Sequence, residues 1–394
     1  MKNIRVAVIG MGNMGTAHAT CIANGEIDGM TVTAICDINR AKTASFQKTW
    51  PEIKTYTDYR ALFEEKTADA VILAVPHPLH AEIAVEALKN NLHVLVEKPA
   101  DISVSKVGML NKTAEESDRV FGIMFNQRTN PLFKKAREIV KSGQLGELKR
   151  TVWIVTNWYR TQCYYDSSDW RATWAGEGGG VLLNQAPHNL DLWQWICGMP
   201  KAVTGFCNIA KYHHIEVEDD ATLITRYENG AVGTFITSTG EYPGTNRLEI
   251  SGDSGKLVLE NGVLKWWKLK KSVKAVIADS DQGFAEIDYD YEEIKQEEPE
   301  TAHKGILQNF ANAVLFGEPL IAPGTDGIYE LSLSNAAYLS SARGNAEIEL
   351  PFDAAEFDGL LSTLAAGETP CGRHAARDGE DRSSCYKARW MVNW

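Results

Sequence analysis

The chain has 394 residues, and its 40 Lys plus Arg and 52 Asp plus Glu give a formal net charge of −12. With 44% hydrophobic and 23% charged residues, it has the composition of a globular protein with room for two domains, which excludes disordered and fibrous classes. The acidic balance excludes nucleic acid and anionic membranes as partners, because neutralising phosphates requires clustered Lys and Arg, so a small molecule is the expected partner.

The first 125 residues alternate short apolar strands with segments long enough for a helix. The five predicted strands are 6–9, 32–35, 70–74, 93–96 and 121–124. Continuous apolar strands separated by helices indicate a parallel sheet covered on both faces, and right-handed crossovers then produce a doubly wound α/β Rossmann fold. We therefore predict a first domain over residues 1–125.

From about residue 147 the apolar runs become longer and alternate with polar residues. The predicted strands are 148–158, 202–210, 221–227, 231–238, 247–251 and 256–259, and Asn229-Gly230 signals a hairpin between two of them. Helices are expected over 301–316 and 326–342, with Asp326 capping the latter. We predict an α+β domain over 126–361 with a large, mainly antiparallel open sheet, whose uncovered face favours a homo-oligomer, a dimer or tetramer.

The end of the chain changes composition, because residues 362–394 show little apolar period. We predict a mobile tail there, with a docking segment for a neighbouring subunit as the alternative. No apolar run reaches the roughly 18 residues of a membrane helix, and Met1 leads straight into a strand instead of a signal peptide. The seven Cys and nine His are scattered, so we expect free thiols in the cytoplasm and no metal site.

A glycine motif follows the first predicted strand and opens the first helix. Its residues are Gly10, Gly12, Asn13, Met14 and Gly15, in the G-x-G-x-x-G pattern, and Asp37 ends the second strand. Glycines let the backbone approach a pyrophosphate, and the Asp carboxylate accepts hydrogen bonds from ribose hydroxyls but repels a 2′-phosphate. The pattern predicts NAD binding. Arg40, three residues after Asp37, is placed to meet a 2′-phosphate, so NADP is the alternative.

Two later strands end in polar residues at the same edge of the sheet. Val75, Pro76, His77 and His80 follow the strand 70–74, and contact with the cofactor is their expected role. Glu97 and Lys98 end the next strand and point to the nicotinamide side. A positively charged nicotinamide would lower the pKa of Lys98, which favours proton transfer.

Motifs in this order are similar to those of the Gfo/Idh/MocA (glucose-fructose oxidoreductase/inositol dehydrogenase) family. They are the Gly10–Gly15 motif, Glu97-Lys98-Pro99, the run 178–180 leading into a helix with His188 and Asp191, and the segment 336–341. The resemblance covers residues 1 to about 360. It implies a Rossmann domain followed by an open-sheet domain, and oxidation or reduction of a secondary alcohol of a sugar, sugar derivative or cyclic polyol with a nicotinamide dinucleotide.

The resemblance also implies two catalytic residues, Lys98 and His188. Inositol dehydrogenase-like members carry Asp four residues before the His, where this chain has Asn184. On a helix, Asn184, His188 and Asp191 share a face, so all three are candidates to border the substrate. Asn binds a hydroxyl but takes no proton, whereas Asp191 is a candidate to orient His188, with a purely structural carboxylate as the alternative.

The chemistry explains this pair of residues. Hydride leaves a carbinol carbon for nicotinamide only if the hydroxyl proton also departs, so the site needs a base. His188 is the expected general base, and Lys98 is expected to hydrogen-bond the developing alkoxide and relay the proton.

Aromatic and polar residues alternate in the segment 164–174, a mixture suited to stacking on a sugar ring and binding its hydroxyls. The predicted substrate-binding residues are Tyr165, Arg171 and Trp174 from this segment, Asn126 and Arg128 after the last parallel strand, and Asn157 at the start of the second domain. The leading hypothesis is an NAD-dependent, inositol dehydrogenase-like oxidoreductase. The alternatives are an enzyme that retains NAD and cleaves glycosides by transient oxidation, and a non-catalytic NAD- and sugar-binding regulator.

Overall fold

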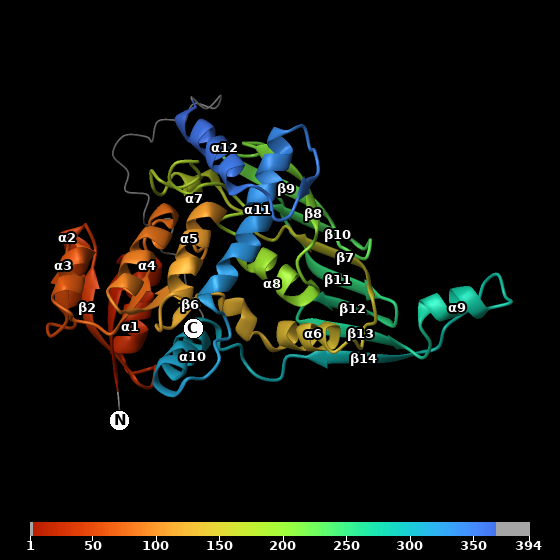
Figure 1. The fold of residues 1–394 in the computed structure, drawn as a ribbon, viewed down its shortest axis with the longest axis horizontal. Coiled ribbons are helices and arrows are strands. Elements are labelled where there is room, and N and C mark those ends of the chain that lie inside the picture. The colour runs from red at the N-terminus through yellow and green to blue at the C-terminus, as the bar shows by residue number, and fades with distance from the viewer. Residues whose placement is uncertain (1–2, 368–394) are drawn as a thin grey trace.

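Two sheets organise the chain in the computed structural model, which describes residues 3–367 (Figure 1). The first sheet has six parallel strands in the order β3-β2-β1-β4-β5-β6. They are β1 (Ile4–Ile9), β2 (Met30–Cys36), β3 (Lys54–Tyr56), β4 (Ala70–Leu73), β5 (His93–Val96) and β6 (Phe121–Ile123). The predicted Rossmann sheet is confirmed, and β3 is an additional strand of three residues at its edge.

Helices connect these strands and cover the sheet. They are α1 (Asn13–Ala23), α2 (Arg40–Gln47), α3 (Tyr59–Glu64), α4 (His80–Lys89) and α5 (Val104–Glu115), with short 3-10 turns η1 (His77–Leu79) and η2 (Asn126–Thr129). All four residues of β4 are buried, as expected for a central strand covered on both faces.

The second sheet has nine strands in the order β14-β13-β12-β11-β7-β10-β9-β8-β15. They are β7 (Leu148–Val155), β8 (Ala202–Ile209), β9 (Glu218–Arg226), β10 (Val232–Ser238), β11 (Asn246–Gly252), β12 (Gly255–Glu260), β13 (Val263–Leu269), β14 (Tyr289–Lys295) and β15 (Ile348–Glu349). All neighbours are antiparallel except β7 and β10. The mainly antiparallel sheet is confirmed, and the Asn229-Gly230 turn joins β9 to β10, with Gly230 at φ +82°.

The helices of the second half of the chain pack against both sheets. They are α6 (Pro131–Lys141), α7 (Gln162–Tyr165), α8 (Pro187–Cys197), α9 (Val273–Asp279), α10 (Ala302–Phe316), η3 (Gly324–Asp326), α11 (Gly327–Ala342) and α12 (Ala354–Ala366). Helices α6, α8 and α11 pack against the nine-stranded sheet, whereas α10 returns to the Rossmann domain, where the Gln308 side chain accepts a hydrogen bond from the Asp28 amide at 2.9 Å (Figure 1).

Two predictions near the C-terminus need correction. Asp326 precedes α11 but makes no side-chain capping bond, because its carboxylate pairs with Arg128 at 2.6 Å. Helix α12 continues to Ala366, past residue 362 where we expected the tail to begin, and residues 368–394 lie outside the described part of the chain. Within residues 3–367 no helix is long and apolar enough to cross a membrane.

Candidate active site

The glycine motif forms a tight turn between β1 and α1. Gly10 has φ +93°, and a Cβ there would lie 2.3 Å from the Ala74 carbonyl oxygen, so this position requires glycine. A Cβ on Gly12, by contrast, would meet nothing within 4 Å. Helix α1 has no side-chain cap and no acidic residue in its first turn, so the amides after Gly12 are available to an anion, and the turn fits a pyrophosphate.

Asp37 lies at the end of β2, where its carboxylate holds this turn. It accepts hydrogen bonds from the amides of Met11 and Asn39, both at 2.8 Å, and Lys42 Nζ lies 3.4 Å away. A carboxylate oxygen has two lone pairs, so Oδ1, which accepts from the Asn39 amide, retains capacity for a ribose hydroxyl, whereas Oδ2 already faces Met11 and Lys42. Arg40 is exposed in the first turn of α2.

The segment after β4 joins the two domains. Val75 is half-buried and Pro76 exposed, while the His77 ring, 8% exposed, contacts the Glu177 carbonyl oxygen through Nδ1 at 3.2 Å. The His80 ring is buried and contacts the Pro99 carbonyl oxygen at 2.7 Å. Each histidine therefore already holds a neighbouring segment, His77 the loop from the second domain and His80 the turn after Lys98.

A buried pair that the sequence analysis did not single out lies beside the glycine motif. His18, on α1, contacts the Glu97 carboxylate through Nε2 at 2.7 Å. Burial raises the pKa of Glu97, but the hydrogen bond and charge of His18 outweigh it and bring that pKa to about 2. The His303 ring lies 5.8 Å from that of His18 and 3.4 Å from the Asn126 amide. The available signal was a histidine three residues after the last glycine of the motif.

Lys98 reaches across to the second domain. Its Nζ donates a hydrogen bond to the Asn184 carbonyl oxygen at 2.9 Å. Burial lowers the pKa of Lys98, and the carboxylates of Glu97, Glu330 and Glu177 oppose that shift. A lysine with a lowered pKa exchanges protons more readily near neutral pH than an exposed one.

His188 lies in the first turn of α8, and its ring edge faces Phe125 at 6.4 Å. Its Nδ1 is buried and has no hydrogen-bond partner among the described residues. Burial and the nearby charge of Lys98 lower the pKa of His188 well below its ordinary value. The imidazole is therefore neutral, and a ring nitrogen is available to a bound molecule.

The second domain contributes a buried carboxylate, that of Glu177, although residue 184 is Asn and not Asp. The Asn184 side-chain amide donates a hydrogen bond to this carboxylate. The carboxylate also accepts from the Ala172 amide at 2.5 Å and lies 3.4 Å from Arg171 Nη1. Burial raises the pKa of Glu177, against the charge of Arg171. Sequence reasoning missed this carboxylate, whose only signal was its place directly before the glycine run 178–180.

Arg128 and Asp191, both predicted to bind substrate, instead bind each other. The guanidinium donates to Asp191 at 2.6 and 2.8 Å and to Asp326 at 2.6 Å, and Arg128 and Asp191 are each 1% exposed. Asp191 has no bond to His188 and accepts a further one from Gln194 at 3.0 Å. These two predictions are wrong, because an Arg buried at this depth requires carboxylate partners.

Tyr165 and Trp174 also turn away from the site. The Tyr165 hydroxyl bonds that of Thr239 at 2.8 Å, and Trp174 is 3% exposed and packs on Tyr338 with ring centroids 5.3 Å apart. Both predictions are corrected to core positions.

Their neighbours point toward the site instead. The Tyr164 hydroxyl accepts from Arg171 at 2.6 Å and from Asn184 at 3.3 Å, and the Trp170 ring lies 5.8 Å from that of His77. Asn157, just after β7, is exposed.

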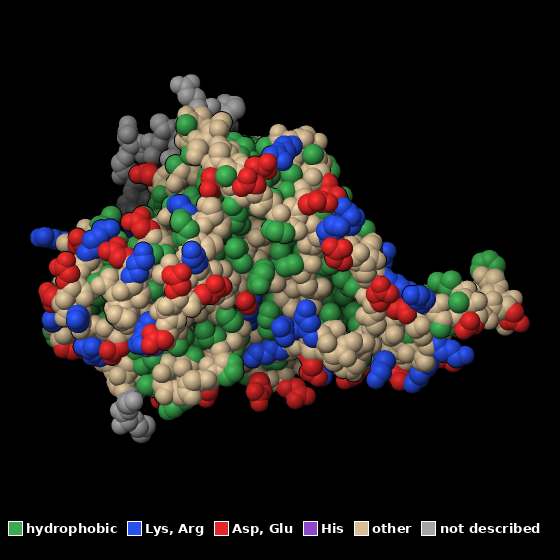
Figure 2. Space-filling model, viewed as in Figure 1, with side chains coloured by type: hydrophobic (Ala, Val, Ile, Leu, Met, Phe, Trp, Pro, Cys, Tyr) green, Lys and Arg blue, Asp and Glu red, His purple; other side chains and the backbone are tan. Residues whose placement is uncertain are grey.

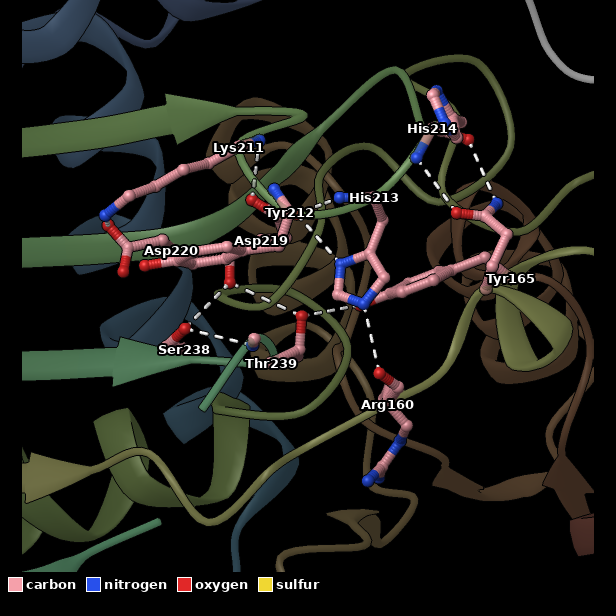
Figure 3. A network of polar contacts seen from close by, with 12 residues as sticks. Arg160, Tyr165, Lys211, Tyr212, His213, His214, Asp219, Asp220, Ser238 and Thr239 are labelled. Carbon is pink, nitrogen blue, oxygen red and sulfur yellow. Dashed lines mark hydrogen bonds and ion pairs between the residues drawn. The ribbon is translucent and has the colours of Figure 1, made fainter. Parts of the chain in front are cut away.

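A separate polar network fixes the loop that carries these residues (Figure 3). Asp219 accepts from the backbone amides of 211, 212 and 213 and contacts the His213 ring at 2.9 Å. The other ring nitrogen of His213 contacts the Arg160 carbonyl oxygen at 3.0 Å, and its ring packs 4.8 Å from that of Tyr165. Every polar atom of the His213 ring is thus used to hold the segment 160–165 in place.

Fold and site together define an oxidoreductase with a dinucleotide-binding domain, and the comparisons with known proteins agree. Residues 4–125 match the model of the oxidoreductase family with an NAD-binding Rossmann fold, and residues 133–258 match the GFO/IDH/MocA C-terminal domain. The chain therefore belongs to the GFO/IDH/MocA family of NAD-binding oxidoreductases.

Curated relatives and solved structures are similar over most of the chain. Myo-inositol 2-dehydrogenase of Thermotoga maritima is 25% identical over 342 residues, which are 85% of this chain and 95% of that protein. The WlbA dehydrogenase of Bordetella pertussis, solved with NADH and UDP-GlcNAcA, superposes with a TM-score of 0.74 at 25% identity over 89% of this chain and all of that one. A levoglucosan dehydrogenase solved with NADH and levoglucosan shares the fold, with a TM-score of 0.73 at 20% identity over 89% of this chain and all of that one.

Proposed function

We propose that this protein transfers hydride between NAD and a secondary alcohol of a sugar, sugar derivative or cyclic polyol. The observation that carries the proposal is a half-buried Lys98 whose charge acts on His188, together with the His188 Nδ1, which has no partner among the described residues. Bound NAD supplies the hydride acceptor. His188 takes the hydroxyl proton, and Lys98 donates a hydrogen bond to the oxygen as negative charge develops on it.

Residues around this pair supply the proposed binding contacts. Asn126 has a buried Oδ1 without a described partner, and Arg171 and Asn184 join Tyr164 in one hydrogen-bonded group, so these side chains are proposed to bind substrate hydroxyls together with Asn157. For the cofactor, the proposed contacts are Gly10, Gly12, Asn13, Met14, Gly15, Asp37, Arg40, Val75, Pro76, His77, His80, Glu97 and Lys98. Asp37 favours NAD over NADP.

Relatives that bear the names of inositol and levoglucosan dehydrogenases support the choice of substrates to test. The experiment follows NADH formation with inositols, aldoses, anhydrosugars and glycosides, with His188→Ala as the control. NADH formation from one of these alcohols that is lost in His188→Ala supports the proposal. Glycoside consumption without net NADH would identify the alternative of transient oxidation, and NAD binding without any turnover would indicate a regulator.

We also propose that the protein is a homo-oligomer, in which a second copy covers apolar surface of the nine-stranded sheet. Phe206, Ile224 and Val232 on that sheet are 40–43% exposed. An arm between β13 and β14 carries α9 away from the body of the molecule (Figure 1), and Figure 2 shows hydrophobic side chains on it. Ile277 and Phe284 on this arm are 76% and 100% exposed, surface that a partner normally covers.

Charge on the arm supports the proposal that the partner is another copy of this chain. Lys271 and Lys274 lie toward one end of α9 and Asp279 and Asp281 toward the other, so two arms related by a two-fold axis pair opposite charges. Light scattering after gel filtration is expected to show a smaller assembly for Ile277→Asp/Phe284→Ser than for the native chain. We also propose a cytoplasmic location, because Cys21, Cys36, Cys197 and Cys207 are free thiols.

A further inference from the structure

Glu330, in the first turn of α11, is a buried carboxyl that the reaction described above does not use. The residue has no exposed surface, and both its oxygens lack a hydrogen-bond partner among the described residues. An ionised carboxylate without donors is costly to bury, so burial raises the pKa of Glu330 well above its ordinary value and keeps it neutral. Such unsatisfied groups are uncommon in proteins and require an explanation.

The helix that carries Glu330, α11, begins next to the turn that follows Lys98. Gly327 approaches Ala100 so closely that a Cβ on it would lie 2.7 Å from the Ala100 Cβ. The charged groups that act on Glu330 are Asp191 from α8 and Lys98 from the end of β5. Asp191 is already paired with Arg128, so Lys98 is the group whose charge Glu330 can respond to.

Three carboxyl groups act on Lys98, and they differ in their hydrogen bonds. Glu97 is held by His18, and Glu177 by the Ala172 amide and Asn184. Glu330 has no donor among the described residues. Of the three, it is the group that gains or loses a proton without breaking a hydrogen bond of the structure.

We propose that Glu330 is the proton-holding residue of the site and acts through Lys98, being ionised while NAD⁺ is bound and protonated once hydride has been transferred. The inference rests on the proposed function. In the oxidation, the carbinol C–H bond breaks and its electron pair leaves with the hydride for nicotinamide. The O–H proton passes to His188, and Lys98 then relays it to the Glu330 carboxylate by rotation of its side chain or through one water.

This transfer keeps the charge of the buried site constant. Nicotinamide loses one positive charge when it accepts hydride, and Glu330 loses one negative charge when it accepts the proton. Because a net charge is costly in a buried site, this compensation lowers the cost of the reaction in both directions.

The test counts protons when the cofactor binds. NAD⁺ and NADH are each titrated calorimetrically into the full-length protein in two buffers that differ in heat of ionisation. We expect the native protein to release about one proton on binding NAD⁺ and about none with NADH, and Glu330→Gln to bind NAD⁺ without release. The control is Glu218→Gln, which alters an equally buried carboxyl held by the Gly180 and Leu182 amides and is expected to release the proton normally.

Other outcomes overturn the inference. Equal proton release from Glu330→Gln would assign the proton to Lys98 or another group, and NAD⁺ binding without release by the native protein would exclude an ionising carboxyl. If Glu330→Gln does not fold, the infrared band of a protonated carboxyl in the native protein decides, because it must decrease when NAD⁺ binds and return with NADH. Failure of the native protein to bind NAD⁺ overturns the proposed function itself.

Discussion

Two clusters of buried charge share helix α8, one through His188 and the other through Asp191, and they differ in whether their polar atoms have partners. In the second cluster the Arg128 guanidinium uses Nε, Nη1 and Nη2 on two carboxylates and on the Ile321 carbonyl oxygen. In the first, His188 Nδ1 and both Glu330 oxygens have no partner among the described residues.

The difference separates structure from chemistry. A fully satisfied buried network stabilises one arrangement of the chain, and its members have no capacity left for a ligand. Unsatisfied buried groups cost stability and are retained where a ligand or a proton completes them. Three residues apart on one helix, His188 and Asp191 therefore differ in whether their polar atoms have capacity for a ligand, and substitutions in the two clusters are expected to separate activity from stability.

The largest effect on activity is expected from the first cluster. His188→Ala and Lys98→Ala should each reduce turnover about 10²–10⁴-fold, equivalent to about 3–5 kcal/mol of barrier, because each removes a group that moves or stabilises the proton. Steady-state kinetics measure this loss, and a fluorescence titration checks that NAD still binds. Near-normal turnover in His188→Ala would leave Lys98 as the base.

The second cluster is expected to lose stability instead. Asp191→Ala leaves the Arg128 charge with one carboxylate in place of two, so the free energy of unfolding should fall by about 3–5 kcal/mol. Denaturant unfolding measures the loss, and turnover per folded molecule should stay close to normal. A large loss of turnover at unchanged stability would instead return Asp191 to the catalytic group.

Asp37 provides a smaller test, at the cofactor end. Asp37→Ser removes a carboxylate that repels a 2′-phosphate and binds ribose hydroxyls, and should move the preference between NAD and NADP by about 1–3 kcal/mol toward NADP. Dissociation constants for both dinucleotides measure the change. An unaltered ratio would show that Asp37 serves only to hold the Met11 and Asn39 amides.

The smallest expected effect is a change in pH dependence at Asn184. Asn184→Asp places a second carboxylate against Glu177, so the pair holds one proton at low pH and carries an added negative charge at higher pH. That charge stabilises protonated His188 and Lys98. The acid limb of kcat/KM should therefore move upward by about one pH unit. Asn184→Ala, which adds no charge, is the control, and an upward shift there too would contradict this explanation.

Sequence reasoning did best where structure is local. Residues 6–9 and 70–74 are apolar throughout, and Gly10 takes the positive φ of +93° that its own turn requires, so the Rossmann sheet and its glycine motif were predictable. Strand β14 was missed because it lies at the sheet edge with six of its seven residues exposed, which leaves no apolar alternation to detect.

In the predicted substrate segment 164–174, sequence analysis chose Tyr165 and Trp174, which the structure places in the core. Tyr164 and Tyr165 are adjacent aromatics in the short helix α7, and only the packing of Tyr165 on His213 decides which of them turns toward the core. Helical spacing likewise placed Asp191 on the face of His188. It could not show that Arg128, 63 residues earlier, occupies that carboxylate.

Taken alone, the amino-acid sequence determined the two-domain fold, the dinucleotide site and the candidates Lys98 and His188, because strand periodicity, glycine sterics and motif order are properties of neighbouring residues. Tertiary structure alone decided which charged groups are satisfied. Glu177 is held by Asn184, the Glu330 oxygens have no partner among the described residues, and Arg128 and Asp191 bind each other. The partners of a buried charge depend on side chains brought from distant parts of the chain and on the water they exclude.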